Sequence, residues 1–266
     1  MADEQAVVLE IDGGVAEIRL VRGEAGNAIN IALASQLAEA VGQVEEKVAA
    51  GEVRAVLIAA EGHAFTFGGD IGLFLEELDR IEELMLEMAR GFNAIVLRLA
   101  ELPAPVVTAV QGAAAGGGLG LVWAADFAYC SPEAIFAPAF DRIGHTGDGG
   151  GTWFLPRLVG LRRAQEMTLG GRIVTGEEAA EWGLVNELVP AEELHSRARA
   201  ESERLAAGPT KALAMTGELV RGSFNRSLAE QLELEAQYMS AASATDDGKE
   251  GIKAFVEKRR PDFRGA

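Results

Sequence analysis

The glycine run Gly116-Gly117-Gly118 places the tightest constraint on how this chain can fold. It follows a strand-like stretch at 106–110 and leads into an apolar helical pattern at 121–125. A strand that turns through glycine into a helix aims backbone N–H groups at negative charge, and the missing Cβ lets a ligand oxygen approach. A tight turn that serves only close backbone packing is the alternative interpretation. Both interpretations predict a sharp strand-to-helix turn.

A second glycine turn lies upstream, at residues 64–71, with the sequence Ala-Phe-Thr-Phe-Gly-Gly-Asp-Ile. It also follows a buried strand, predicted at 53–60, and precedes a helix. Strands of a layered sheet tend to lie beside one another, so we expect the two turns to face one pocket. Two N–H groups that converge on one oxygen form an oxyanion hole, and each such donor typically lowers a reaction barrier by about 2.7–4 kcal/mol.

Composition excludes several classes of partner. The chain has 266 residues, of which 48% are hydrophobic, and a net charge of -17, with Lys258-Arg259-Arg260 as the longest basic cluster. This acidic balance argues against binding to nucleic acid or to an anionic membrane. The start of the chain lacks a basic segment followed by an apolar run, and we find no membrane-spanning segment, so we expect a cytoplasmic protein.

The few cysteines and histidines argue against disulfides and metal sites. A single cysteine, Cys130, excludes an intrachain disulfide and a thiolate metal cluster, and we expect it to be a small buried apolar group. The three histidines are widely separated and show no ligand spacing. We therefore expect neither a metal nor a separate cofactor.

Hydrophobic periodicity predicts an α/β fold with a helical C-terminal part. Apolar and polar residues alternate on both sides of Asp12-Gly13-Gly14, which indicates a hairpin. Further strands are expected at 53–60, 105–110, 126–130, 134–137 and 184–189. Helices are expected at 31–49, at 72–101 with a break near Gly91, from about 117, after Gly151, at 161–169, at 176–181 and through most of 191–257.

Several stretches together resemble the crotonase family, which comprises enoyl-CoA hydratases and isomerases. The resembling segments are Gly26–Asn30, Ala64–Ile71, Gln111–Gly118, Ala179–Val185 and Pro261–Phe263. The resemblance covers nearly the whole chain. It implies a spiral of ββα units over residues 1–190 that binds acyl-CoA, followed by a helical trimerisation region over 191–266.

The resemblance also implies an enzyme of acyl-CoA or fatty acid metabolism, with CoA arriving as part of the substrate. By position, the N–H groups of Gly69 and Gly117 would form the oxyanion hole. CoA would be held by backbone groups near Ala28 and along residues 64–71, which include Ala64, Phe67, Gly68, Asp70 and Ile71. Candidate cations for the CoA phosphates are Arg22 and residues 258–260, although a solvated tail is the more ordinary interpretation of the latter. Homotrimers or dimers of trimers are the expected assemblies.

Departures from the family pattern bear on the reaction. Hydratases of the family place two glutamates over the substrate, and the matching positions here are Gly120 and Phe140. Neither residue can activate water or move a proton. Asp148, just before the helix expected after Gly151, resembles the aspartate that moves the proton in the family's isomerases, including those that act on ring CoA esters. A cap of that helix is the alternative role for Asp148.

The remaining histidine, phenylalanine and aspartate candidates have structural as well as functional interpretations. His145 lies three residues before Asp148, and it is either a second acid/base group or a loop histidine on the surface. Phe67 and Phe140 either narrow the acyl pocket or pack in the core. Asp70 is expected to cap or brace its turn, and His63 and His195 are expected to be exposed.

We therefore predict an acyl-CoA isomerase that works through an enolate, with Asp148 as the proton carrier. Other enolate reactions on the same scaffold, namely hydration, carbon–carbon cleavage and dehalogenation, remain alternatives, and so does a non-catalytic acyl-CoA binding protein. A dehydrogenase of the Rossmann type is disfavoured because the glycine run does not complete G-x-G-x-x-G. A serine hydrolase is disfavoured because the chain contains no G-x-S-x-G elbow.

Overall fold

A six-stranded sheet carries the fold of this computed structural model, which describes residues 5–266. The strand order is β1-β2-β3-β4-β6-β9, with β1 and β2 antiparallel and every other neighbouring pair parallel. The bounds are β1 Val7–Asp12, β2 Val15–Leu20, β3 Ala55–Ala60, β4 Val106–Val110, β6 Phe127–Cys130 and β9 Glu187–Leu188. The predicted hairpin and buried strands are confirmed, and the strand expected at 184–189 pairs over two residues only. Residues 1–4, on which the expectation about the chain's start rests, lie outside the described part.

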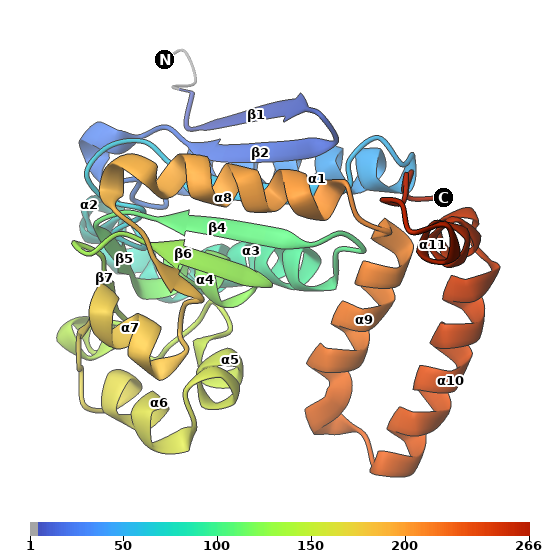
Figure 1. The fold of residues 1–266 in the computed structure, drawn as a ribbon. Coiled ribbons are helices and arrows are strands. Elements are labelled where there is room, and N and C mark those ends of the chain that lie inside the picture. The colour runs from blue at the N-terminus through green and yellow to red at the C-terminus, as the bar shows by residue number, and fades with distance from the viewer. Residues whose placement is uncertain (1–4) are drawn as a thin grey trace.

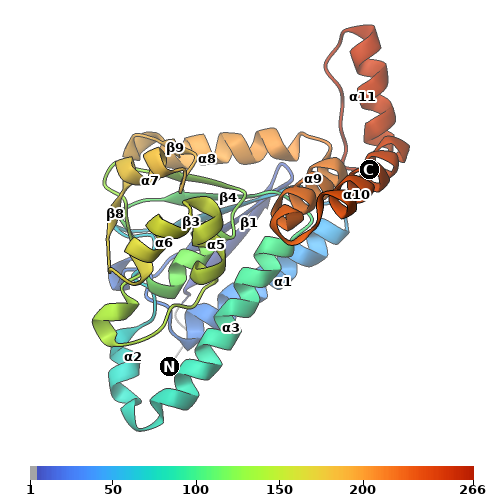
Figure 2. The same ribbon diagram turned by 90° about the horizontal axis from the view of Figure 1, so that it is seen from below.

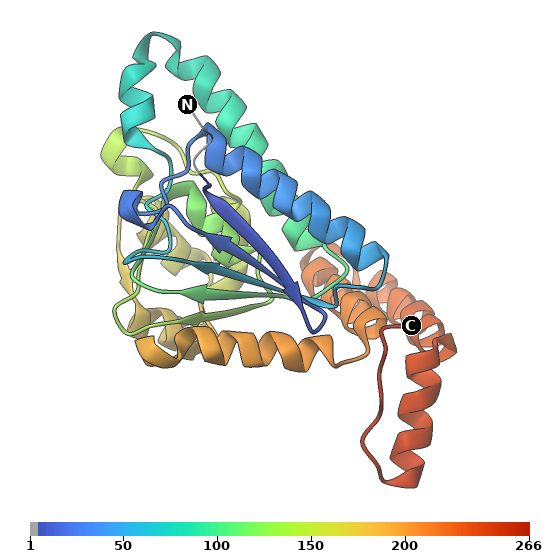
Figure 3. The ribbon, with the colours of Figure 1, turned by 90° about the horizontal axis from the view of Figure 1, so that it is seen from above.

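Helices cover both faces of this sheet because its central strands are apolar on both sides. Val56 and Ile58 of β3 pack into the larger core, beneath α1 (Ile31–Ala49) and α3 (Ile81–Glu101). Ala55 and Leu57 point the other way, against α8 (Ala191–Ala206). Figure 3 shows the sheet between these two helical layers. Cys130 is a buried free thiol in β6, as expected.

A second, three-stranded sheet extends the fold next to the first (Figure 1). Its strands are β5 (Ala113–Ala115), β7 (Ile135–Ala137) and β8 (Val174–Thr175), of which β5 and β8 were not predicted. Short helices lie beside it, namely α4 (Gly120–Trp123), α5 (Gly151–Leu158), α6 (Leu161–Thr168) and α7 (Gly176–Trp182). The helix predicted from about 117 begins as a 3-10 turn at Gly116–Leu119 before α4.

The break expected near Gly91 is wrong. The predicted segment 72–101 instead divides into α2 (Ile71–Glu76), a 3-10 turn at 78–80 and α3. The chain leaves the helical conformation at Glu77, where φ is -108° and ψ is 22°. Gly91 stays helical because the buried residues that follow it, among them Phe92 and Ile95, pack against the core and offset the low helix propensity of glycine.

The last three helices, α9 (Thr210–Gly222), α10 (Leu228–Ala244) and α11 (Asp246–Glu257), project away from the sheets (Figures 1 and 2). An ion pair of 2.6 Å between Arg221 and Asp126 ties α9 to the core. The domain boundary at residue 190 stays a prediction: α8 packs on the sheet, and Leu213 of α9 packs against the same hydrophobic cluster. Within residues 5–266, no helix is both long and apolar enough to cross a membrane.

Candidate active site

The first glycine turn is held in place by an inward-facing asparagine and by a short β-bridge. Asn27 is fully buried, and its Nδ2 donates to the carbonyl oxygens of Glu61 and Ala64, each at 2.9 Å. Ile29 forms a parallel bridge with Gly69 in which Ile29 N donates to Gly68 O and Asp70 N donates to Ile29 O. The N–H of Gly69 takes no part in this pairing, so it is free to face elsewhere.

Thr66 connects the first turn to the second. This fully buried residue bridges to Ala114, with Thr66 N donating to Ala113 O and Ala115 N donating to Thr66 O. Its hydroxyl donates to Asn27 O at 2.9 Å and accepts from Gly68 N at 3.0 Å. The side chain also occupies the space where a Cβ on Gly118 would stand. A single threonine therefore sets the spacing between the two turns.

The two turns lie close to one another, as predicted. A Cβ on Gly116 would lie 3.4 Å from Gly68 Cα and 3.9 Å from Gly69 N. Gly68 has φ of +81°, and a Cβ there would lie 2.8 Å from Ala115 O, so the approach requires glycine. Within residues 5–266, neither Gly69 N nor Gly117 N donates a hydrogen bond. Two unused amides beside one another can stabilise negative charge on a ligand oxygen.

Asp148 lies directly beside the second turn. A Cβ on Gly117 would be 2.5 Å from Asp148 Oδ1, which places the carboxylate against the glycine backbone. That oxygen is buried and has no hydrogen-bond partner among the described residues. Burial raises the pKa of the Asp148 carboxyl, and a hydrogen bond from its own backbone N–H opposes this in part. A carboxylate that has one buried, unpartnered oxygen and a raised pKa is suited to proton transfer.

The alternative role for Asp148, a cap of the following helix, is not observed. Helix α5 begins at Gly151, its N-cap residue is Gly150, and no side chain caps it. The Asp148 side chain is therefore not used to satisfy the start of α5.

The two positions where the family's hydratases carry glutamate look different from one another in the structure. A Cβ on Gly120 would lie 2.7 Å from both Gly149 O and Val96 Cγ2, so no side chain fits there without movement. Phe140 is half-buried, and its ring lies beside Gly147: a Cβ on that glycine would be 3.6 Å from Phe140 Cε2. The space that a glutamate at 120 would need is filled by the backbone next to Asp148.

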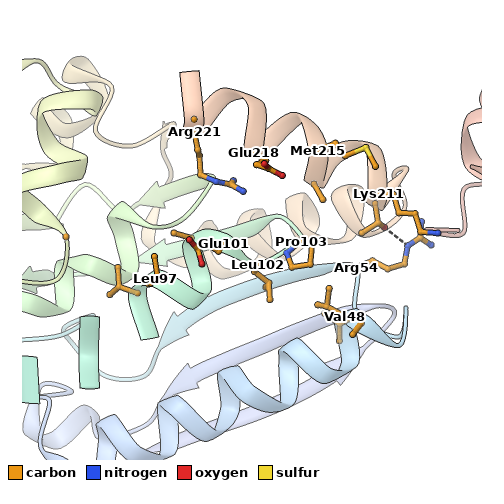
Figure 4. Close-up of a pocket in the computed structure, with 18 of the residues that line it drawn as sticks. Val48, Arg54, Leu97, Glu101, Leu102, Pro103, Lys211, Met215, Glu218 and Arg221 are labelled. Carbon is orange, nitrogen blue, oxygen red and sulfur yellow. Dashed lines mark hydrogen bonds between the residues drawn. The ribbon is translucent and has the colours of Figure 1, made fainter. Parts of the chain in front are cut away.

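A large cavity, of about 1580 Å³, opens beside this constellation and extends toward α9. At one end it is lined by Asp148, Asn93, Val96, Trp153 and Phe154. At the other end α9 contributes Lys211, Met215 and Glu218, which face Leu97, Glu101 and Leu102 in Figure 4. The end nearest Asp148 is mostly apolar, which suits the hydrocarbon part of a ligand.

The remaining predicted residues of the first turn have structural contacts. Asp70 caps α2, as expected, by accepting from Gly72 N at 3.0 Å and Leu73 N at 3.3 Å. Phe67 is 49% exposed and packs against Gly26 and edge-on to His63. Ile71 is 55% exposed, whereas Ala64 is buried and Ala28 half-buried.

His145 lies on the surface, and two of the cations predicted for the CoA phosphates, Arg22 and Arg259, are bound by other groups of the chain. His145 is exposed in the loop that precedes Asp148. Arg22 donates to Ala28 O at 2.6 Å, so its guanidinium holds the first turn from inside. Arg259 pairs with two glutamates of α11, and α11 lies at the opposite end of the molecule from α2 (Figure 2). His63 and His195 are exposed, as expected, and His195 Nε2 lies 2.9 Å from Glu17 Oε1.

Sequence reasoning missed three residues that build the site, namely Asn27, Thr66 and Asn93. Asn93 Oδ1 accepts from Gly149 N at 2.9 Å and so touches the loop beside Asp148. A polar residue next to the apolar positions of α3 was the available signal for Asn93. Asn27 and Thr66 had no signal in their spacing, because they form hydrogen bonds with partners 34 and 39 residues away.

Comparison with known proteins finds relatives that match nearly the whole chain. Residues 10–266 match the family described as enoyl-CoA hydratase/isomerase. The chain is 38% identical to a probable enoyl-CoA hydratase of Rhodobacter capsulatus over 96% of both chains. It is 34% identical to the 1,2-epoxyphenylacetyl-CoA isomerase of Escherichia coli over 97% of this chain and 98% of that protein.

A solved enoyl-CoA hydratase from Polaromonas superimposes with a TM-score of 0.91 at 29% identity, covering 97% of this chain and 100% of that one. This likeness confirms the predicted α/β crotonase fold. Relatives of both names, hydratase and isomerase, match over nearly the full length, so the isomerase branch is not singled out. The chain is an acyl-CoA enzyme and belongs to the crotonase, or enoyl-CoA hydratase/isomerase, family.

Proposed function

We propose that this enzyme is an acyl-CoA isomerase that moves a double bond through an enolate, with one carboxylate carrying the proton. The observation that carries the proposal is the Asp148 carboxylate lying against Gly117 while position 120 has no room for a side chain. Hydration by two glutamates needs a second acid/base group, and Gly120 and Phe140 supply none. One carboxylate is sufficient to move a proton between two carbons of the same acyl group.

The proposed reaction begins with the thioester oxygen of a 3-enoyl-CoA between the N–H groups of Gly69 and Gly117. Asp148 takes a proton from the α-carbon, and the electron pair of that C–H bond moves into a dienolate whose charge rests on the thioester oxygen. The protonated Asp148 then returns its proton to the γ-carbon. The double bond now lies between the α- and β-carbons, and the carboxylate is restored.

The electrostatics support this cycle. Burial disfavours the charged form of Asp148, and this raises its pKa toward the range where uptake and release of a proton are both easy. As the carboxylate is neutralised, the negative charge passes to an oxygen held by two backbone amides that need no reorganisation.

Asp148→Asn tests the proposal because it keeps the shape of the side chain and removes the base. With 3-hexenoyl-CoA as the probe, we expect turnover and deuterium uptake at the α-carbon to fall about 10²–10⁴-fold, with binding of the CoA ester retained. Asp141→Asn is the matched control, since this acidic residue of the same loop is exposed. Wild-type turnover in Asp148→Asn would contradict the proposal.

Assays of the unmodified protein separate the alternatives. Formation of a 3-hydroxyacyl-CoA from 2-hexenoyl-CoA would favour hydration, which the name of the R. capsulatus relative also suggests. Tight binding without α-proton exchange in the unmodified protein would favour a non-catalytic binding protein.

We also propose that CoA lies along the first turn, near Ala28 and residues 64–71, and that the chain assembles as a homotrimer or a dimer of trimers. Support for assembly comes from large apolar side chains exposed on and beside α9–α11, namely Val220, Phe224, Leu228, Leu232, Met239, Ile252, Phe255 and Val256. Exposed apolar surface on this scale is typical of an interface. Sedimentation equilibrium would measure the subunit number, and a monomer at micromolar concentration would contradict the proposal.

A further inference from the structure

The loop that carries Asp148, between β7 and α5, has an irregular backbone. Four of its residues have positive φ: Ala139 (58°), Gly144 (70°), Gly149 (60°) and Gly150 (77°). A segment of this kind is not fixed by the repeating hydrogen bonds of a helix or strand. The position of the Asp148 carboxylate therefore depends on individual contacts that the loop makes with its surroundings.

One such contact comes from α3. Asn93 Oδ1 accepts a hydrogen bond of 2.9 Å from Gly149 N, the backbone amide immediately after Asp148, across 56 residues of sequence. Gly149 also packs so closely on the second turn that a Cβ there would overlap Gly117 O. The amide of Asn93 thus holds the loop at the point where it touches the oxyanion turn.

Asn93 lies outside the hydrophobic core, so its hydrogen bond to the loop can be removed without a change in core packing. Its neighbours Phe92, Ile95 and Val96 are buried, whereas Asn93 itself is exposed and lines the cavity beside Asp148. Removal of an exposed side chain leaves no void in the core, so the fold is expected to tolerate substitution there.

We propose that Asn93 is a positioning residue that keeps the Asp148 carboxylate against Gly117 by holding Gly149 N–H. The inference rests on the proposed function in so far as Asp148 is the proton carrier. A misplacement of about 1 Å costs on the order of 100-fold in rate, so an anchor one residue from the base has a large effect on turnover.

A neutral acceptor is the suitable choice at position 93. A carboxylate there would accept the same hydrogen bond but would add a second negative charge to the loop of Asp148. The cations of this region do not offset such a charge. Arg142 and His145 on the same loop are exposed, and Arg157 on α5 is bound to Trp153 O and Asn225 Oδ1. Arg221 and Arg226, which line the same cavity, are paired with Asp126 and Glu218. Asn93→Asp therefore separates the loss of the anchor from a change in charge.

The test compares Asn93→Ala, Asn93→Asp and the control Glu87→Ala, an exposed residue on the same helix. Turnover of 3-hexenoyl-CoA is measured against pH, and hydrogen exchange is followed in the peptide that contains Gly149. We expect Asn93→Ala to lower kcat about 10- to 100-fold with KM changed less than about threefold, and to speed exchange at Gly149. Glu87→Ala should match the wild type in both measurements.

Asn93→Asp should retain slow exchange at Gly149 and recover most of the turnover at high pH. Turnover of Asn93→Asp should increase at a higher pH than turnover of the wild type, because the added negative charge makes Asp148 harder to ionise. Wild-type turnover and exchange in Asn93→Ala would overturn the proposal, as would equal losses in both measurements for the Ala and Asp variants. If Asp148→Asn keeps full activity, the proposed function fails, while exchange at Gly149 still reports whether Asn93 anchors the loop.

Discussion

Asp148 and Gly117 are in direct contact: a Cβ on the glycine would lie 2.5 Å from Asp148 Oδ1 and 3.2 Å from Oδ2. The candidate base and the candidate oxyanion donor therefore belong to one packed unit, although 31 residues separate them. Because residue 117 has no side chain, both the Asp148 carboxylate and a ligand oxygen can approach its backbone. This relationship makes the glycine testable without removal of its N–H.

Gly117→Ala should displace the Asp148 carboxylate while it leaves the backbone amide in place. We expect turnover to fall about 100-fold, the usual cost of a shift of about 1 Å. The change in Tm should be small, because the displaced carboxylate is the end of a flexible side chain. Gly91→Ala is the matched control: a Cβ there meets nothing within 4 Å, and it should raise stability by up to about 1 kcal/mol. Steady-state kinetics and thermal melts check both, and full activity in Gly117→Ala would show that the contact is dispensable.

Gly120→Glu, which restores a glutamate at a position expected in the family's hydratases, should not produce a hydratase. The added Cβ would lie 2.7 Å from Gly149 O, a backbone atom that cannot turn aside. Overpacking of this kind costs about 1–3 kcal/mol, and it would push the loop away from Gly117. Urea denaturation and hydration of 2-hexenoyl-CoA are the measurements. A stable variant with new hydratase activity would mean that the space at 120 is larger than the structure shows.

The sequence was sufficient to predict the strands and helices that bury continuous apolar surface, and α1 was predicted at its observed bounds of 31–49. The short strands β5 and β8 escaped prediction because they consist of three and two residues and pair only through tertiary contacts. In the site, the two glycine turns and Asp148 were identified from the resemblance and from turn chemistry. Thr66 and Asn93 were not, because the hydrogen bonds from Thr66 to Asn27 O and from Gly149 N to Asn93 join residues that are far apart along the chain, and a polar position beside apolar ones does not name its partner.

Asp148→Asn should make the protein more stable near neutral pH, even as it removes activity. Burial raises the folded-state pKa of Asp148 above its unfolded value, so the folded state binds more protons between those two values. Its contribution to stability is therefore greatest at acid pH and declines as pH rises through the folded pKa. The difference in Tm between variant and wild type should grow from about pH 4 upward, and a difference independent of pH would contradict the assignment.

Arg157→Ala should loosen the contact between α5 and the turn that follows α9. The Arg157 guanidinium carbon lies 3.9 Å from the centroid of the Trp153 ring and 5.8 Å from that of Phe224, and Nη2 donates to Asn225 Oδ1 at 3.3 Å. A stack on exposed rings is worth about 0.5–1 kcal/mol, so we expect a slightly lower Tm and faster hydrogen exchange at residues 223–226. Arg157→Lys should rescue little, because an ammonium has neither the planar stack nor the fork of donors. Arg162→Ala, which changes an exposed arginine in the next helix, is the control and should behave like the wild type.

The loss of Arg157 should also weaken the preference among acyl chains of different length, because Trp153 and Asn225 both line the cavity beside Asp148. This preference is measured as kcat/KM for butenoyl-, hexenoyl- and decenoyl-CoA. Unchanged exchange at 223–226 together with an unchanged chain-length preference would show that other contacts hold α5 to the turn after α9.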